Sequence, residues 1–491
     1  MHAITSIRSV FPFPLRLYDA KDAIPVRSWA PHRVPCRRWS RHATCSSSSS
    51  QACALGIDLG TTTSSVAIIG ADGKPELLPI HGSLLVPSVV TCSKSGKLEL
   101  GCTGPDSDPD VLVFRSFKRI LGQRHEEADA LGVGAGLGPA GCRLSPGRGG
   151  EAELRCRGLG AAVAPVDLTA ALLSGLVRGV EARVGQAVDH AVLTVPADWG
   201  PSRHAAVLRA ARAAGLPDAL RLLQEPVAAA LAHGLGAGLD GELALVVDIG
   251  GGTTDVSLVQ AFAGALELLG TIGDAALGGN DVDAALAARL FPEAGRGDPA
   301  AQSAAERAKI TLSAGPGGPV AAESGQVAAA CMLSDLQAVL PPFFAALAAL
   351  LEEFGTQHGI GWATEPQVAA ERAVASLGEG GGEDPAQALG RSGAAPPSPG
   401  PPPQATPAAW GLPPPRRVTR VLCVGQATEM LGVHAFLALL TGVRPSVGMP
   451  PAHAVAAGAA VYAGMLLGSV PELEIVEGPF AAAPHGRTSG F

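Results

Sequence analysis

The sequence has few aromatic residues and no long apolar run. Aromatic residues make up only 4% of the 491 residues, whereas Gly occurs 63 times and Pro 41 times, which favours long loops and packing between small side chains. No apolar run approaches the roughly 20 residues that a membrane-spanning helix needs. We therefore expect a soluble protein that does not contact a membrane. Its 47% of hydrophobic residues is enough to fill the cores of two or more lobes.

Cysteine is sparse, and the spacing of the cysteines matches no zinc-binding or redox motif. The nine cysteines are scattered, and no pair has the spacing of a zinc site or of a redox dithiol. Cys331 and Cys423 lie in apolar surroundings and are predicted to be small core residues. This usage is consistent with a reducing compartment.

Acidic residues are rare in the first fifty positions. Residues 1–50 contain seven Arg and one Lys against Asp19 and Asp22, a balance of +6, and they end in a serine run at 46–50. This pattern is typical of an organellar transit peptide, and the serines favour the plastid stroma over the mitochondrial matrix. The alternative is a disordered tail without a function. Subtracting +6 from the total of −8 leaves −14 for the rest, which argues against nucleic-acid binding.

A strand–turn–strand pattern occurs twice, at 54–69 and at 243–259. Each unit has a buried strand, a turn rich in Gly and Thr, and a second strand. Such an internal repeat suggests two related lobes facing one another across a cleft. We predict lobe I over 54–240 and lobe II, with a closing helix, over 241–467.

The remaining segments are predicted as follows. Residues 110–121 are predicted to be helical and 122–165 to be mostly loop. Residues 376–417 are rich in Gly and then in Pro, so they cannot form a core and are predicted to be a flexible insertion. The tail at 468–491 is predicted to be loose.

The two turns contain the groups that a magnesium-bound triphosphate requires. Glycine lets backbone N–H groups approach an anion closely, and Thr hydroxyls add further donors. A carboxylate at a strand end can hold Mg²⁺ through water, because this ion gives up its waters reluctantly. Either turn alone is equally compatible with an ordinary hairpin, but two such turns together predict a phosphate site. The residues are Asp58, Gly60, Thr61 and Thr62 in one turn, and Asp248, Gly250, Gly251, Gly252, Thr253 and Asp255 in the other.

Several further motifs occur in a family's order over about 54–467. The stretches GIDLGTTTSSVAII, FKRILGQR, LLQEPVAAALAHGL, VVDIGGGTTDVSLV, LGGNDVDAALAARL, ERAKITLS and VLCVGQATEMLG resemble those of the seventy-kilodalton heat-shock (Hsp70, DnaK-like) chaperones. The resemblance implies an α/β fold of the two-lobed, actin-like ATPase type, in which duplicated ribonuclease-H-like lobes flank a nucleotide cleft. It also implies that the cofactors are ATP or ADP with Mg²⁺.

The resemblance implies a role for each matching residue. Asp58 and Asp248 would hold hydrated Mg²⁺, and Asp255 would orient water nearby. Lys118 would stabilise charge on the γ-phosphate, and Glu225 would position the attacking water. Taken alone, Lys118 reads as a solvated base on a helix and Glu225 as a helix start. The residues implied for phosphate oxygens are Thr61, Thr62 and Thr253.

The end of the site that would meet adenosine departs from the family. Glu306, Lys309 and Ser313 share one helix face, and the resemblance implies that this face, with Gly425, meets the adenosine. A helix with a polar outer face is the ordinary alternative. The family has glycine, serine, arginine and aspartate where this chain has Gln426, Ala427, Glu429 and Ala452. Glu429 cannot stack on adenine as an arginine does, a contact that contributes about 0.5–2 kcal/mol, so we expect weaker or less base-selective binding.

Two further departures concern coupling and the C-terminus. An arginine associated with coupling between domains aligns with His204, although Arg203 adjoins it. Residues 473–476 could be a remnant of the family's interdomain linker, and the fifteen residues after them cannot form a peptide clamp. An ATPase-only protein and an incomplete gene model both explain this, and the second would also explain the insertion at 376–417.

Three functions remain open at this point. The first is a Mg²⁺-dependent ATPase of chaperone type that acts in protein folding through J-domain co-chaperones and nucleotide-exchange factors, and meets unfolded clients only indirectly. The second is a pseudo-ATPase that holds a nucleotide without hydrolysing it and regulates chaperones or their co-chaperones. The third is a small-molecule kinase with the same phosphate turns, which the motifs LLQEPVAAALAHGL and ERAKITLS disfavour.

Overall fold

The computed structural model describes residues 52–101, 111–130, 137–139, 141–157, 159–236, 241–294, 298–315, 318–325, 327–377, 414–471 and 473–476. The predicted transit segment 1–50 and nearly all of the predicted insertion 376–417 lie outside these residues, so both stay predictions.

The first sheet contains the first of the two predicted strand–turn–strand units. Its strands lie in the order β11-β10-β1-β2-β3, and β4 also pairs with β2. β1 is parallel to β10 and antiparallel to β2. The bounds are β1 Ala54–Asp58, β2 Thr63–Ile69, β3 Pro75–Leu77, β4 Val86–Pro87, β10 His190–Val195 and β11 Leu220–Gln224.

The second sheet repeats this arrangement around the second unit. Its strands lie in the order β17-β12-β13-β14-β18, with β12 parallel to β17 and antiparallel to β13. The internal repeat that the sequence predicted is therefore present as two similar sheets. The bounds are β12 Leu243–Ile249, β13 Thr254–Phe262, β14 Ala265–Asp274, β17 Arg420–Val424 and β18 Glu474–Val476.

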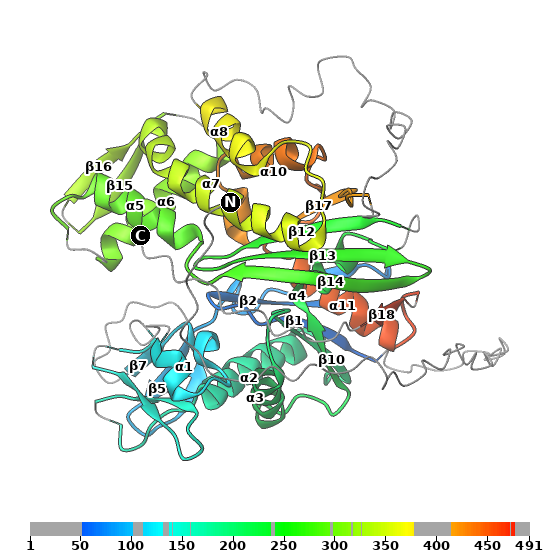
Figure 1. The fold of residues 1–491 in the computed structure, drawn as a ribbon. Coiled ribbons are helices and arrows are strands. Elements are labelled where there is room, and N and C mark those ends of the chain that lie inside the picture. The colour runs from blue at the N-terminus through cyan, green and yellow to red at the C-terminus, as the bar shows by residue number, and fades with distance from the viewer. Residues whose placement is uncertain are drawn as a thin grey trace, which may run out of the picture. The chain divides into compact units, whose positions relative to one another are not determined.

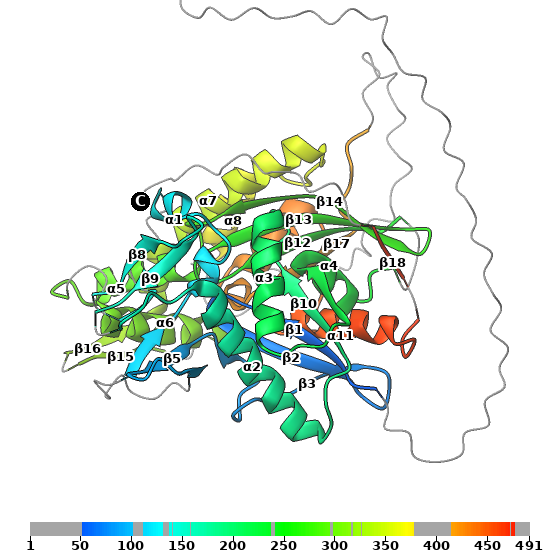
Figure 2. The same cartoon turned by 90° about the horizontal axis from the view of Figure 1, so that it is seen from below.

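Helices cover both faces of each sheet, as Figures 1 and 2 show from two sides. Successive side chains of a strand point to opposite faces, so Leu245 and Val247 belong to one core while Ala244 and Val246 belong to another. The first sheet packs on α2 and α3, the second on the group from α5 to α10, and α4 and α11 contribute to the core between the sheets. The bounds are α2 Pro165–Val184, α3 Pro201–Ala213, α4 Glu225–Ala232, α5 Gly279–Leu290, α6 Pro299–Ala314, α7 Leu333–His358, α8 Pro366–Ser376, α10 Val433–Thr441 and α11 Ala454–Leu466.

The remaining described elements are short. They are β5 Val90–Ser93, β6 Leu98–Leu100, β7 Val111–Phe114, the 3₁₀ turn η1 Phe117–Ile120, α1 His125–Ala130, β8 Arg143–Pro146, β9 Ala152–Arg155, β15 Val320–Ser324, β16 Val327–Cys331 and the 3₁₀ turn η2 Gln426–Glu429.

Two segments differ from their predictions. Residues 111–121 are not a helix, because β7 pairs with β5 and Ser116 at φ 52° separates that strand from η1. The tail at 468–491 is not wholly loose, because β18 pairs with β14 and forms the edge of the second sheet. Fewer than half of the described residues in 122–165 are helix or strand, so the prediction of mostly loop holds there, with α1 and the β8–β9 hairpin as the exceptions.

Two apolar helices, α11 and α7, pack in ways that composition alone does not predict. The closing helix α11 lies in the range predicted as lobe II, yet it contacts β1, β2 and β10 of the first sheet as well as α4. α7 is 26 residues long, and by length and composition alone it could cross a membrane. It packs as a core helix against α8, α5 and β14, with Leu340 and Phe344 fully buried.

Glycines allow the central helices to approach their neighbours closely. A Cβ atom on Gly458 of α11 would lie 1.7 Å from the Ala228 carbonyl oxygen of α4, and one on Gly56 of β1 would lie 2.2 Å from the Ala460 nitrogen. No side chain fits at such distances. Small-residue packing, which the composition predicted, therefore holds the layer between the sheets together.

We predict that Gly458→Ala destabilises the protein. In an open helix this change would stabilise by about 1 kcal/mol, but here the overpacking should cost about 1–3 kcal/mol and reverse the sign. Chemical denaturation measures the free energy of unfolding. Gly200→Ala is the matched control, because no atom lies within 4 Å of its Cβ position. A Gly458→Ala protein as stable as the control would contradict the close approach.

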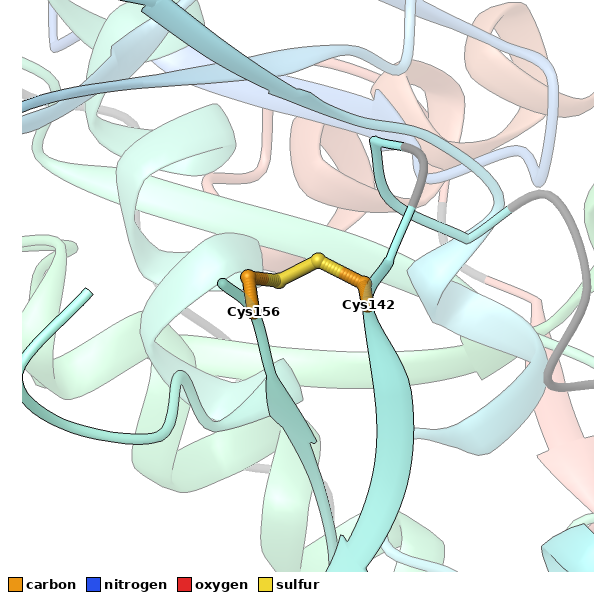
Figure 3. The surroundings of a disulfide bond; sticks show 2 residues. All are labelled: Cys142 and Cys156. Atoms are coloured by element: carbon orange, nitrogen blue, oxygen red, sulfur yellow. A yellow bond between two sulfur atoms is a disulfide. The ribbon is translucent and has the colours of Figure 1, made fainter. Parts of the chain in front are cut away.

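A disulfide joins Cys142 to Cys156 across the ends of the β8–β9 hairpin (Figure 3). The strands pair Arg143 with Arg155, so the two cysteines are the next residues outward on each strand. The other described cysteines, at 53, 92, 331 and 423, are free and buried. The prediction of Cys331 and Cys423 as core residues is confirmed, whereas the bridge was not predicted from the cysteine spacing.

We predict that reduction of this disulfide destabilises the protein. The cysteines are 14 positions apart, and a crosslink closing a loop of about 15 residues stabilises by about 3 kcal/mol in the chain-entropy treatment. Thermal denaturation with and without dithiothreitol measures the effect. The double variant Cys142→Ser/Cys156→Ser is the control and should not respond to the reductant. An equal response of both proteins would sink the prediction.

Candidate functional site

The two Gly/Thr turns meet at the same place in the molecule. Gly60 is so tightly turned that a Cβ atom on it would lie 2.0 Å from the Thr63 carbonyl oxygen. In the second turn the Gly250 N–H donates to the Thr253 carbonyl at 2.9 Å. A Cβ atom on Gly251 would lie 3.3 Å from the Thr62 hydroxyl oxygen. The structure therefore brings the predicted phosphate residues of both turns together.

Acidic side chains gather where β1 and β12 approach these turns. Asp58 is the last residue of β1, and the Thr194 hydroxyl lies 3.4 Å from its Oδ1. On the other sheet Asp248 of β12 stands directly opposite Asp255 of β13. A small pocket beside them is lined by Glu225, Asp248 and Asp255 among other residues. Like charges placed opposite one another destabilise a strand pair, so folding alone does not account for this arrangement.

Lys118 and Glu225 form an ion pair within the same site. The Lys118 Nζ lies 2.8 Å from the Glu225 Oε1, and the side chains are only 9% and 15% exposed. Lys118 comes from η1, while Glu225 is the first residue of α4, directly after β11. The alternative of a solvated base on a helix is thus wrong for Lys118, since it is buried and lies in a 3₁₀ turn. Glu225 is the first residue of a helix, as the alternative interpretation held, and its side chain also lies in the site.

The carboxyl groups raise one another's pKa values. Burial, then the charge of Glu225, raises the pKa of Asp58 to about 7, although Lys118 opposes the shift. Burial and the charges of Glu225 and Asp58 raise the pKa of Asp248 to about 8. Burial and the neighbouring acids raise the pKa of Asp255 well above its ordinary value. The metal-free site therefore keeps part of these carboxyl protons at neutral pH, because one lysine does not neutralise all four acids.

The donor set suits a hydrated magnesium ion. Among the described residues no group of three His, Cys, Asp or Glu side chains is arranged to hold a metal directly. Carboxylates that bind the waters of an ion stand farther from it, and Mg²⁺ usually keeps several of its waters. Asp58 and Asp248 are the residues that would hold such an ion.

The predicted adenosine face is only partly free. Lys309 is buried, and its Nζ lies 2.8 Å from Asp283 Oδ1 and donates to the Gly279 carbonyl at 3.1 Å. Burial raises the pKa of Asp283 to about 6, with Lys309 opposing the shift and Glu306 contributing to it. Lys309 therefore already has an acidic partner, and Glu306 on the same helix is exposed.

Gly425 begins the turn where the sequence departs from the family that it resembles, and Ser313 of α6 contacts the chain just after this turn. The Leu431 N–H donates to the Ser313 hydroxyl at 3.2 Å. Gly425 has φ 77°, and a Cβ atom on it would lie 2.5 Å from Asp248 Oδ1, so this turn abuts the acidic cluster. Ala427 packs beside Gly279, while Gln426 and Glu429 are exposed.

Several residues at the site were not predicted from the sequence. Thr194 hydrogen-bonds Asp58, and Trp199 lies under the Lys118 ammonium at 5.4 Å from the ring centroid. The Asn280 N–H donates to the Gly251 carbonyl, and Asp283 pairs with Lys309. Asn280 and Asp283 lie inside the stretch LGGNDVDAALAARL that carried the family resemblance. Only their pairing in space assigns them to the site.

Comparison with known proteins agrees with this geometry. The model of the Hsp70 protein family matches residues 54–323. This chain belongs to the Hsp70 family. The predicted resemblance is thereby confirmed, and the α/β structure with its repeated sheets agrees with the predicted actin-like ATPase fold.

Similar proteins share the name "Chaperone protein HscA homolog". One from Acidithiobacillus ferrooxidans is 40% identical over 246 residues, 49% of this chain and 38% of its own length. One from Pseudomonas putida is 39% identical over 261 residues, covering 51% and 40%. One from Bordetella petrii is 31% identical over 421 residues, covering 85% and 58%. The matched part of this Hsp70 chain thus spans roughly two fifths to three fifths of each of these relatives.

The raised carboxyl pKa values predict how pH affects the metal-free protein. The folded pKa values of Asp58 and Asp248, about 7 and about 8, exceed the ordinary 3.8. The stability linked to these protons is present below about pH 4 and is lost as the pH rises through the folded pKa values. We expect the melting temperature to fall between about pH 4 and pH 8 in EDTA and to level off above that range. The melting temperature of the Asp248→Asn variant should fall less steeply over this range. An equally steep fall would contradict the raised pKa of Asp248.

Proposed function

We propose that this chain binds ATP or ADP together with Mg²⁺ and hydrolyses ATP slowly, as an ATPase of chaperone type. The observation that carries the proposal is the excess of acid beside the two phosphate turns. Asp58, Asp248, Asp255 and Glu225 surround a single lysine. A divalent cation with a phosphate chain would compensate these charges, and membership in the Hsp70 family supports ATP as the nucleotide.

Different residues would bind the phosphates and the hydrated magnesium ion. The N–H groups and hydroxyls of the turns at 60–62 and 250–253 would bind phosphate oxygens, because both turns face one point and turns of this kind form anion sites. Bound Mg²⁺ would supply charge neutralisation at the phosphates. Asp58 and Asp248 would accept hydrogen bonds from its waters.

Hydrolysis would depend on the pair of Lys118 and Glu225. Lys118 would leave this pair to stabilise the charge that develops on the phosphate. Glu225 would then be free to orient the attacking water. Burial of both side chains strengthens such electrostatic effects, since little solvent screens them.

A second candidate keeps nucleotide binding and loses turnover. Gln426, Ala427, Glu429 and Ala452 replace the family's residues at the adenosine end, and Lys309 already pairs with Asp283. A protein of this kind would regulate chaperones or their co-chaperones. In either case the proposed partners are J-domain proteins and nucleotide-exchange factors, and the proposed location is an organelle, the plastid stroma before the mitochondrial matrix.

Calorimetry with Mg·ATP, followed by measurement of released phosphate on the same sample, separates the candidates. Binding with slow phosphate release supports the ATPase. Binding without release supports the second candidate. If millimolar ATP does not bind, both nucleotide proposals fail.

We predict that Lys118→Ala retains nucleotide binding and loses hydrolysis. Removing one group that stabilises transition-state charge costs about 10²–10³-fold in rate. The affinity for ADP should change little, because ADP lacks the γ-phosphate. Lys97→Ala, at an exposed ion pair with Glu99, is the control and should hydrolyse normally. Unchanged phosphate release by Lys118→Ala would exclude the proposed role.

A further inference from the structure

The turn that carries Lys118 is bounded by two left-handed backbone positions, of which Ser116 is strained and Gly122 is not. Lys118 lies in η1, only four residues long. Ser116 precedes it at φ 52° and Gly122 follows it at φ 70°, both in the left-handed region that costs an L-residue other than glycine free energy. A 3₁₀ turn of this length has little stability of its own. The position of Lys118 must therefore be fixed from outside the turn.

Arg203 supplies that external support. Its Nη2 donates to the carbonyls of Lys118 at 3.1 Å and Arg119 at 3.2 Å, and its Nε donates to the Leu121 carbonyl at 3.2 Å. The neighbouring Ser202 hydroxyl donates to the Gly122 carbonyl at 3.0 Å. One planar guanidinium thus donates to three backbone carbonyls from two of its nitrogens, in a fixed fork geometry that a lysine ammonium lacks.

Trp199 holds the guanidinium and the Lys118 ammonium against one ring. The Arg203 Cζ lies 4.1 Å and the Lys118 Nζ 5.4 Å from the centroid of the ring, both within the ~6 Å range of cation–π attraction. Trp199 is 4% exposed. Burial lowers the pKa of Arg203 to about 10, while the charges of Asp198, Glu225 and Glu127 oppose the shift, so the guanidinium is charged at neutral pH.

We propose that Arg203, stacked on Trp199, is a positioning residue that fixes the Lys118 turn and so determines where the Lys118 ammonium meets the phosphate. The proposal rests on the proposed hydrolysis for its functional consequence. Its structural part, that Arg203 fixes the Lys118 turn, can be tested without any nucleotide. Arg203 would contact neither the nucleotide nor the attacking water. It would act only through the backbone of the turn that carries Lys118.

Acylation of the Lys118 amine tests, without nucleotide, whether Arg203 fixes the Lys118 turn. We call the contacts of Arg203 with this turn the clamp. Arg203→Ala should make Lys118 react severalfold faster with an acylating reagent, as followed by mass spectrometry. Lys309, buried in another ion pair, is the internal reference and should not change. Arg209→Ala, an exposed arginine on the same helix, is the matched control. Lys118 labelling that stays at the wild-type rate in Arg203→Ala would overturn the proposal, whatever the wild-type protein does with ATP.

Single-turnover kinetics test the consequence. Arg203→Ala should bind Mg·ATP with little change in Kd, while the hydrolysis rate should fall about tenfold to a hundredfold, as expected when a catalytic group is misplaced. Free guanidinium should restore part of the rate in this variant and none in Lys118→Ala. Arg203→Lys retains the charge and guards against misfolding of the alanine variant. Wild-type hydrolysis by Arg203→Lys would show that charge alone suffices and would overturn the fork-shaped clamp.

The two proposals fail in different ways. If wild-type protein binds or hydrolyses no ATP but Lys118 labelling rises in Arg203→Ala, the proposed function fails and the clamp stands. If wild-type protein hydrolyses ATP and neither labelling nor rate responds to Arg203→Ala, the clamp fails and the proposed function stands.

Discussion

The convergence of four carboxylates on one lysine is the constraint on which the rest of the site depends. Asp248 and Asp255 stand opposite one another on paired strands, an arrangement that is destabilising when both are charged. Burial, and then the charges of Glu225 and Asp58, raise the pKa of Asp248. The surrounding sheets must supply the stability that this cluster removes, and a bound cation would return part of it.

The sheets hold the acids because each has a core on both faces. β1 and β12 are buried strands whose ends face one another, and α4 and α11 fill the layer between the sheets. Gly458 lets α11 approach α4 to a distance that no side chain permits. The low aromatic content fits this architecture, since alanine and glycine rather than large rings form the closest contacts of α11 with α4 and β1.

The fold and the main site residues could be predicted from the sequence, because glycine and aspartate at strand ends are local signals. Asp58 and Asp248 were predicted together for this reason, and the structure brings them together. Lys118 was predicted only from the family resemblance, since its surroundings come from distant segments such as Trp199 and α3. Its turn was predicted as helix because the positive φ of Ser116 leaves no mark in composition.

The adenosine end was less predictable for a related physical reason. Helical spacing places Glu306, Lys309 and Ser313 on one face, but it does not reveal what that face meets. Asp283 comes from another helix and takes Lys309 as its partner, while Glu306 is exposed. The disulfide was also unpredictable, because hairpin pairing rather than cysteine spacing brings Cys142 to Cys156.

Glu225 connects the chemistry to the architecture. It is the first residue of α4, and α4 contacts β12, β13 and β14 of the second sheet as well as α11. The Glu225 carboxylate pairs with Lys118, and the turn that carries Lys118 is hydrogen-bonded to Arg203. Arg203 belongs to α3, which packs on the first sheet. A phosphate that drew Lys118 away from Glu225 would therefore change an interaction between groups carried by both sheets. If the proposed function holds, nucleotide binding and the packing between the sheets would therefore be energetically linked through this ion pair.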